Sequence, residues 1–190
     1  MTVMSPPVSA APIGLPRGRP LTRDDLDAMP DDGHRYELID GVLVVSPAPR
    51  PIHQRVILNL VRALDPHVPK HLEMLFAPLD VVLADNTVLQ PDVLVGHRAD
   101  FTERDLSAAP VLAIEVLSSS TRAFDLLLKK DRLQRAGCAH YWVVDPDVPT
   151  IIMWRLENGA YVEAGTATGD ETLRMDAPFP VDIVPAQLLT

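Results

Sequence analysis

Two apolar stretches separated by one helix-length segment constrain the fold of this chain more than any other feature. Residues 111–117 and residues 141–144 are almost continuously apolar, as in strands that are covered on both faces. The segment between them, residues 121–136, has the length of a crossover helix, and Gly137 follows it where a left-handed helix cap is favoured. The two strands are therefore predicted to be parallel and joined by a right-handed connection.

Turn and helix signals precede these strands. Residues 36–39 and 42–45 flank Asp40-Gly41, a dipeptide suited to the positive φ angles of a tight hairpin turn. Pro51 suits the first turn of a helix. The helix that follows has one apolar face, whose members recur every four residues: Ile52, Val56, Leu60 and Leu64.

Further strands complete the expected fold. They are predicted over residues 74–83 and 92–95, and a second hairpin over residues 151–156 and 161–163 surrounds Asn158-Gly159. The order αβββαβ predicts an α/β fold with a central mixed β-sheet flanked by helices, plus an N-terminal and a C-terminal hairpin.

The first 20 residues differ from the rest in composition. Residues 1–20 hold five prolines among small side chains, so they are expected to be a disordered, Pro-rich tail. Thr22, followed three residues later by Asp25, predicts a short helix that Pro30 ends. Residues 21–190 are expected to form a single domain, which is usual for a chain of this length.

Composition limits the classes of protein to which the chain can belong. With 47% hydrophobic and 23% charged residues, the chain is expected to be globular with a packed core. Cys138 is the only cysteine, and no apolar run approaches the roughly 20 residues that cross a bilayer, so we expect a cytoplasmic protein without a membrane span. The formal net charge of -9 implies that any contact with nucleic acid is local.

Two acids occur where a strand would otherwise be apolar. Asp92 follows Pro91 at the start of one predicted strand, and Glu115 lies inside another. A buried carboxylate needs a cation or several hydrogen bonds, and a divalent cation such as Mg²⁺ would satisfy both acids together. The alternative is that Asp92 is a strand-end acid and that Glu115 pairs with a lysine or arginine. Composition does not decide between these interpretations.

The predicted helix over residues 121–136 holds the densest cluster of positive charge. Asp125 and Lys129 stand four residues apart, so an ordinary ion pair on a solvated face is one interpretation. The other interpretation is that Lys129 lies beside a metal-bound phosphate and orients the attacking water. Candidate nucleic-acid contacts on this helix are Arg122, Lys130 and Arg132.

Glu37 and His53 carry weaker signals. Glu37 points to the opposite face of its strand from Tyr36 and Leu38, which by itself suggests an acid on the surface of a hairpin. His53 lies near the edge of the apolar face of its helix, which suggests a partly buried ring.

The order of these motifs resembles the Uma2 family of bacterial proteins, which is assigned to the PD-(D/E)XK nuclease superfamily with its restriction-endonuclease-like fold. The resemblance runs from about Thr22 to the end of the chain. It rests on residues 35–41, Ser46-Pro47-Ala48-Pro49, His53, Pro91-Asp92, residues 115–118, Asp125 with Lys129, Ala136-Gly137 and residues 141–146.

The resemblance implies a restriction-endonuclease-like core and a metal site built from Asp92 and Glu115. It also implies that Glu37 reaches the same cleft and that His53 and Asp125 line it. The superfamily's usual motif has a lysine two positions after the second acid, where this chain has Leu117. The resemblance therefore points to Lys129 on the next helix. Another departure is Leu133, which stands where such sequences often have a tyrosine.

The expected function is metal-dependent phosphodiester hydrolysis by a DNA endonuclease. Asp92 and Glu115 would hold Mg²⁺ or Mn²⁺, Lys129 would assist the attacking water, and Glu37 would bind a second metal or orient the first ion's water. Nucleic acid is the expected partner, and a homodimer is plausible because two sites related by a two-fold axis suit a duplex. Two alternatives stay open: a catalytically quiet nucleic-acid-binding or regulatory module on the nuclease fold, and a hydrolase of another phosphate ester.

Overall fold

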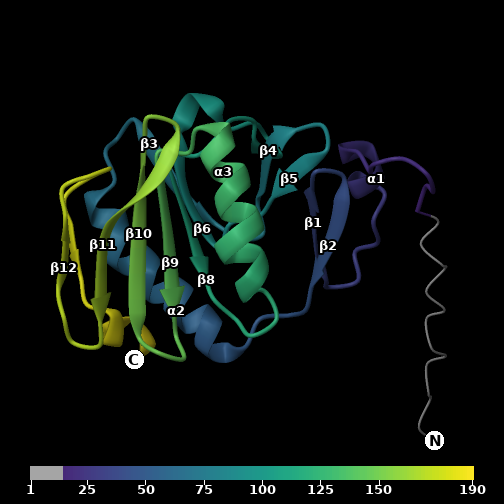
Figure 1. Ribbon diagram of the computed structural model, residues 1–190. Helices are drawn as coiled ribbons and strands as arrows, with labels where there is room; N and C mark the ends of the chain where they lie inside the picture. The colour runs from purple at the N-terminus through teal and green to yellow at the C-terminus, as the bar shows by residue number, and fades with distance from the viewer. Residues whose placement is uncertain (1–14) are drawn as a thin grey trace, which may run out of the picture.

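Two mixed β-sheets, a small two-stranded sheet and few helices make up residues 15–190, the part of the chain that the computed structural model describes (Figure 1). The α/β class is as predicted, whereas the prediction of one central sheet is wrong. Some strands that come between the predicted core strands in the sequence do not join them in the same sheet. They pair with the N-terminal hairpin instead and form a second sheet with it. Among residues 15–190, no helix is long and apolar enough to cross a membrane.

The larger sheet contains the predicted core and has the strand order β11-β10-β9-β8-β6-β3. Strands β8 and β9 are parallel, as predicted, and the other pairs are antiparallel. The predicted C-terminal hairpin is β10-β11, which extends this sheet. The strand bounds are β3 (Leu72–Phe76), β6 (Val93–His97), β8 (Leu112–Val116), β9 (His140–Asp145), β10 (Thr150–Glu157) and β11 (Ala160–Thr168).

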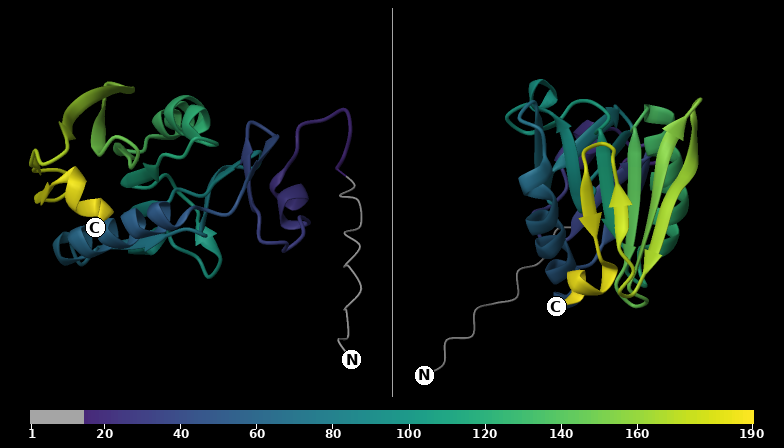
Figure 2. Two further views of the ribbon diagram at one scale, coloured as in Figure 1. Left: turned by 90° about the horizontal axis from the view of Figure 1, so that it is seen from below. Right: turned by 90° about the vertical axis from the view of Figure 1, so that its left-hand side faces the viewer.

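Helices cover both faces of the larger sheet (Figures 1 and 2). Leu60 of α2 (Pro51–Leu64) packs in one cluster with Ile114 of β8, whereas Leu133 of α3 (Lys130–Ala136) packs in another with Ala113. Alternate residues of one strand thus meet different helices, because side chains alternate across a sheet. This arrangement explains why β8 is apolar along nearly its whole length. Burying a leucine such as Leu60 or Leu133 stabilises the fold by about 2 kcal/mol.

The smaller sheet has the order β2-β1-β5-β4-β7. The single strand predicted over residues 74–83 is wrong, because the chain leaves the larger sheet at Ala77-Pro78 and enters the smaller one. Pro78 has no N–H to donate to a ladder, and the Ala77 N–H donates to the Asp92 carbonyl oxygen at 3.1 Å. The strands are β1 (Arg35–Ile39), β2 (Val42–Ser46), β4 (Asp80–Ala84), β5 (Thr87–Leu89) and β7 (Asp105–Leu106).

The remaining elements are short. The predicted first helix is α1 (Arg23–Asp27), where Asp25 accepts the Thr22 backbone N–H at 2.8 Å. A two-stranded sheet near the C-terminus was not predicted, because its strands are too short to show a period. It consists of β12 (Leu173–Met175) and β13 (Val181–Ile183), and the 3-10 helices are Asp65–His67, Arg98–Asp100 and Pro185–Leu189.

The predicted tail falls largely outside the described residues, since residues 1–14 are not described. Residues 15–20 have no helix or strand, but they contact the domain. Leu15 packs against the cluster around Leu38, and Arg19 pairs with Asp25 at 2.6 Å. The segment from Leu15 onward is therefore attached to the smaller sheet.

Replacing Gly41 by alanine is expected to lower the free energy of unfolding by about 2–4 kcal/mol. Gly41 has a φ of +77°, and an added Cβ would overlap the Cβ of Pro20. The matched control is Gly159→Ala, because Gly159 has a similar φ of +82° but no atom of the described chain within 4 Å of the new Cβ. Chemical denaturation should show a loss of only about 1 kcal/mol for the control. Equal losses would contradict the close packing of Pro20 on the hairpin.

Candidate active site

The three predicted acids come from both sheets and meet where the sheets adjoin. Glu37 lies on β1 of the smaller sheet, Glu115 lies on β8 of the larger sheet, and Asp92 directly precedes β6. Val93 is paired with Ile114, so continuing this register by one residue places Asp92 opposite Glu115. The Asp92 Oδ2 atom also accepts the backbone N–H of Val116 at 2.8 Å.

The ammonium group of Lys129 joins the acids. Its Nζ lies 3.0 Å from Glu37 Oε1, 3.1 Å from Glu115 Oε1 and 3.5 Å from Asp125 Oδ1. All four residues are buried, and Lys129 is only 1% exposed. Glu115 therefore pairs with a lysine, as one of the two interpretations of the sequence held, and that lysine is Lys129. The exposed Asp125–Lys129 pair that the sequence also allowed is excluded, because neither side chain reaches the surface.

A π-helix brings Lys129 to this position. The segment predicted as one α-helix begins as the π-helix η3 (Phe124–Lys129) and continues as α3. It buries Asp125 and Lys129 but leaves the apolar side chains of Leu127 and Leu128 exposed. This is the reverse of an ordinary amphipathic helix, and π-helical turns occur often at functional sites. The Tyr141 hydroxyl fixes the turn by donating to the Asp125 carbonyl oxygen at 2.7 Å.

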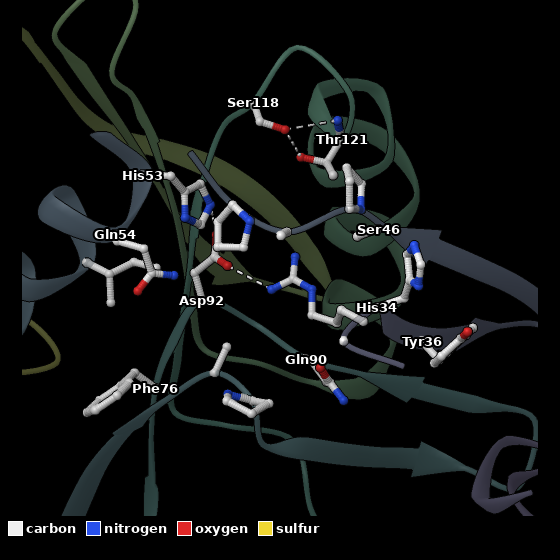
Figure 3. A pocket seen from close by; sticks show the side chains of 18 of the residues that line it. His34, Tyr36, Ser46, His53, Gln54, Phe76, Gln90, Asp92, Ser118 and Thr121 are labelled. Carbon is white, nitrogen blue, oxygen red and sulfur yellow. Dashed lines mark hydrogen bonds and ion pairs between the residues drawn. The ribbon is translucent and has the colours of Figure 1, made fainter. Parts of the chain in front are cut away.

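Asp92 has its own set of partners at the cleft, where Figure 3 shows it near His53. Arg35 Nη1 donates to Asp92 Oδ1 at 2.9 Å, and His53 Nε2 lies 3.1 Å from Asp92 Oδ2. Burial by itself would raise the pKa of Asp92. The hydrogen bond with His53 and the charges of Arg35, His53 and Lys129 outweigh burial and lower this pKa to about 2. Asp92 is therefore ionised at neutral pH.

The cluster contains more acids than permanent cations. Four carboxylates, those of Glu37, Asp92, Glu115 and Asp125, face the two cations Arg35 and Lys129. Burial, together with the neighbouring carboxylates, raises the pKa of Glu115 well above its ordinary value despite the contact with Lys129. Lys129 shows the converse, since its three carboxylates outweigh burial and raise its pKa. An added positive charge would relieve this imbalance.

A divalent cation fits the donor atoms of this cluster in type and charge. Glu37 Oε2 and Glu115 Oε2 are buried and have no hydrogen-bond partner within residues 15–190. Among the same residues, no group of three or more His, Cys, Asp or Glu side chains is arranged to hold a metal ion by itself. Mg²⁺ commonly uses only one or two carboxylates and completes its shell with water and substrate oxygens. The two free oxygens of Glu37 and Glu115 are compatible with such a cation.

A cleft of about 1100 Å³ opens onto the cluster at Asp92 (Figure 3). Asp92, Arg35 and His53 line it, together with the loop over residues 46–49 and the loop over residues 118–121. Among the described residues that line this cleft there is no Glu37, Glu115, Asp125 or Lys129. The structure thus places His53 in the cleft, as the resemblance implied, whereas Asp125 lies behind its wall.

The basic residues that we expected to contact nucleic acid have other partners. Arg122 pairs with Asp145, Lys130 lies 3.7 Å from the ring centre of Trp154, and Arg132 pairs with Asp40 at 3.1 Å. Not one of these three basic residues belongs to the cleft lining as described. The arginines that do line it are Arg35, Arg50 and Arg55.

Sequence reasoning missed the role of Arg35, although a signal was present. Arg35 precedes Glu37 by two residues on one strand, so both side chains lie on the same face. Leu133, at the position where related sequences often have a tyrosine, is buried in the core together with Tyr141.

The fold is similar to that of a solved protein. The crystal structure described as "a putative nuclease belonging to DUF820 from Anabaena variabilis" superposes with a TM-score of 0.70. The two chains are 20% identical, and the match covers 90% of this chain and 98% of the other. No curated protein matched this chain. At this level of identity the similarity establishes the fold alone.

The sequence also matches a family. The family model described as "Uma2: Putative restriction endonuclease" matches residues 23–188, which include both sheets and every residue of the acidic cluster. The match begins at α1 and ends in the C-terminal 3-10 helix, so it covers well over half of the chain. This chain therefore belongs to the Uma2 family.

Proposed function

We propose that the protein is a metal-dependent phosphodiester hydrolase that cleaves DNA. The observation that carries this proposal is a buried cluster of four carboxylates, balanced by only two permanent cations, that meets an open cleft at Asp92. Family membership supports the same reaction class. The cleft has space for the substrate, and the excess negative charge of the cluster would attract a cation.

Asp92 and Glu115 are the proposed ligands of Mg²⁺ or Mn²⁺. Support comes from the register that places Asp92, directly before β6, opposite Glu115 on β8, and from the Glu115 Oε2 atom, which lacks a partner among residues 15–190. A bound divalent cation would lower the pKa of a water molecule and stabilise negative charge on the phosphate. Glu37, whose Oε1 accepts the Gln90 backbone N–H at 2.7 Å, is held in place beside them.

Lys129 and Arg35 are proposed to hold the carboxylates in position. We expected Lys129 to assist the attacking water, but its burial behind the cleft lining supports a positioning role, in which it holds Glu37 and Glu115 together. Arg35 faces the cleft and is 20% exposed in its side chain, so it can contact both Asp92 and a phosphate oxygen of the substrate.

A cleavage assay tests the proposal. Wild-type protein is expected to cut DNA in the presence of Mn²⁺ or Mg²⁺ and to be inactive in EDTA. Asp92→Asn is expected to lose cleavage and most of the increase in melting temperature that Mn²⁺ gives the wild type, because a metal ligand is removed. The matched control is Asp170→Asn, since Asp170 is exposed and does not line the cleft, and it should retain both properties.

Two outcomes would contradict the proposal. Equal stabilisation of wild type and Asp92→Asn by Mn²⁺ would remove Asp92 from the metal site. No cleavage of DNA, RNA or small phosphodiesters with either metal would contradict hydrolysis and favour the binding module described above.

A further inference from the structure

The cleft is lined by aromatic rings close to Asp92. They are Tyr36 of β1, His53 of α2 and Phe76 of β3, together with His34 directly before β1. Figure 3 shows Phe76 on one side of Asp92 and the rings of His34 and Tyr36 on the other. Phe76 is 55% exposed although it lies on a strand of the larger sheet, so its ring is available to a ligand. Exposed aromatic rings beside a reactive site are suited to stacking on planar groups.

Strand register fixes Phe76 near the acids. Phe76 is the last residue of β3 and is paired with Val93, the residue after Asp92. The next residue, Ala77, donates its N–H to the carbonyl oxygen of Asp92 at 3.1 Å. The register sets the Phe76 side chain on the same face as that of Val93, but Phe76 and Asp92 both line the cleft, and Figure 3 shows them near each other, so a planar group stacked on Phe76 would lie within reach of Asp92.

The rest of the lining is more apolar than a backbone-binding groove would be. Leu58, which is half exposed, and Pro47, Pro49 and Pro78 also line the cleft. A duplex presents charged phosphates and sugars on its outside and keeps its base faces covered. An unpaired strand offers the faces of its bases, which apolar and aromatic side chains can bind.

The small number of cations in the cleft also favours an unpaired strand over a duplex. The cleft has three arginines, of which Arg35 is paired with Asp92 and Arg50 with Asp147. The chain as a whole carries a net charge of -9. Duplex binding depends largely on contacts to many phosphates, for which this surface has few cations. Affinity must therefore come mainly from contacts with bases.

We propose that the cleft binds an unpaired nucleobase, with the base stacked on Phe76 and the attached phosphate directed toward Asp92 and Arg35. This inference deepens the proposed function by naming its substrate class, which is a single strand or a splayed nucleotide. It rests on the proposed function only for the cleavage of the bound strand. The volume of about 1100 Å³ is sufficient for a ligand larger than one phosphodiester group. A free nucleotide offers the same chemistry, so the test includes one.

Binding measured in EDTA separates recognition from cleavage. Fluorescence anisotropy would compare a short labelled DNA strand with the same strand annealed to its complement. We expect the single strand to bind about 10-fold more tightly than the duplex, and Phe76→Ala to weaken single-strand binding roughly 5-fold or more. Phe76→Trp should retain binding because it keeps a stacking ring. The matched control is Val162→Ala on β11, which is 48% exposed and does not line the cleft.

Competition identifies the group that is recognised. Deoxyadenosine monophosphate should displace the strand, whereas deoxyribose 5-phosphate, which has the phosphate but no base, should not. Equal or tighter binding of the duplex, or an unchanged affinity in Phe76→Ala, would overturn the inference. Metal-dependent cleavage of duplex DNA without single-strand preference would leave the proposed function intact. Single-strand preference without any cleavage would support the inference and contradict the proposed function.

Discussion

Replacing Lys129 by methionine is expected to lower the free energy of unfolding of the metal-free protein by about 3–5 kcal/mol. Methionine has a similar length but no charge, so Glu37, Glu115 and Asp125 would lose the ammonium group that all three contact. Removing one partner of a buried ion pair leaves an uncompensated charge, which is why this loss is large. Urea denaturation in EDTA measures it.

Lys130→Met is the matched control. Lys130 is the next residue along the helix, and its ammonium lies over the ring of Trp154, a contact worth about 0.5–1 kcal/mol at a partly exposed site. The control should therefore change stability by no more than about 1 kcal/mol. If both variants lost the same amount, Lys129 would not be the cation that balances the buried acids.

Glu115→Gln is expected to have opposite effects on stability and activity. Cleavage should fall roughly 100-fold or more, because a proposed metal ligand is lost. In EDTA at pH 8, stability should rise, because burial and the neighbouring carboxylates disfavour the charged form of Glu115 and the glutamine variant removes that charge. The amide oxygen of glutamine can still accept from Lys129, which lies 3.1 Å from Glu115 Oε1.

The pH dependence of this gain has a defined sign. Burial and the neighbouring carboxylates raise the pKa of Glu115 in the folded protein above the ordinary value of 4.5, so the folded state binds the proton more tightly than the unfolded state. The wild type therefore loses stability as the pH rises from 4.5 through the folded pKa, and the glutamine variant avoids this loss.

Thermal unfolding of both proteins from pH 4 to pH 8 should show their stabilities diverging as the pH rises. Glu103→Gln serves as a control, because Glu103 is exposed and has no contact with the cluster. A constant difference across the pH range would show that folding does not raise the pKa of Glu115.

Local sequence determined much of the fold. Asp40-Gly41 forms the hairpin turn, with φ angles of +54° and +77°, and the four-residue period from Pro51 forms α2. The parallel pair β8-β9 follows from two apolar strands and the helical segment between them. Each of these features depends on residues close in sequence, or on one amphipathic period, so short-range physical chemistry specifies them. The strand predicted over residues 74–83 failed where a single proline redirected the chain to another sheet.

The tertiary structure alone decided which charges meet. Asp92 and Glu115 could be chosen from the sequence because an acid in an apolar strand needs a partner, but either a metal or a lysine could have satisfied them. Lys129 reaches Glu37, and Arg35 reaches Asp92, only because the two sheets adjoin and η3 turns two charged side chains inward. Such contacts join residues far apart in the chain, and their energies depend on burial and distance, which no local pattern encodes.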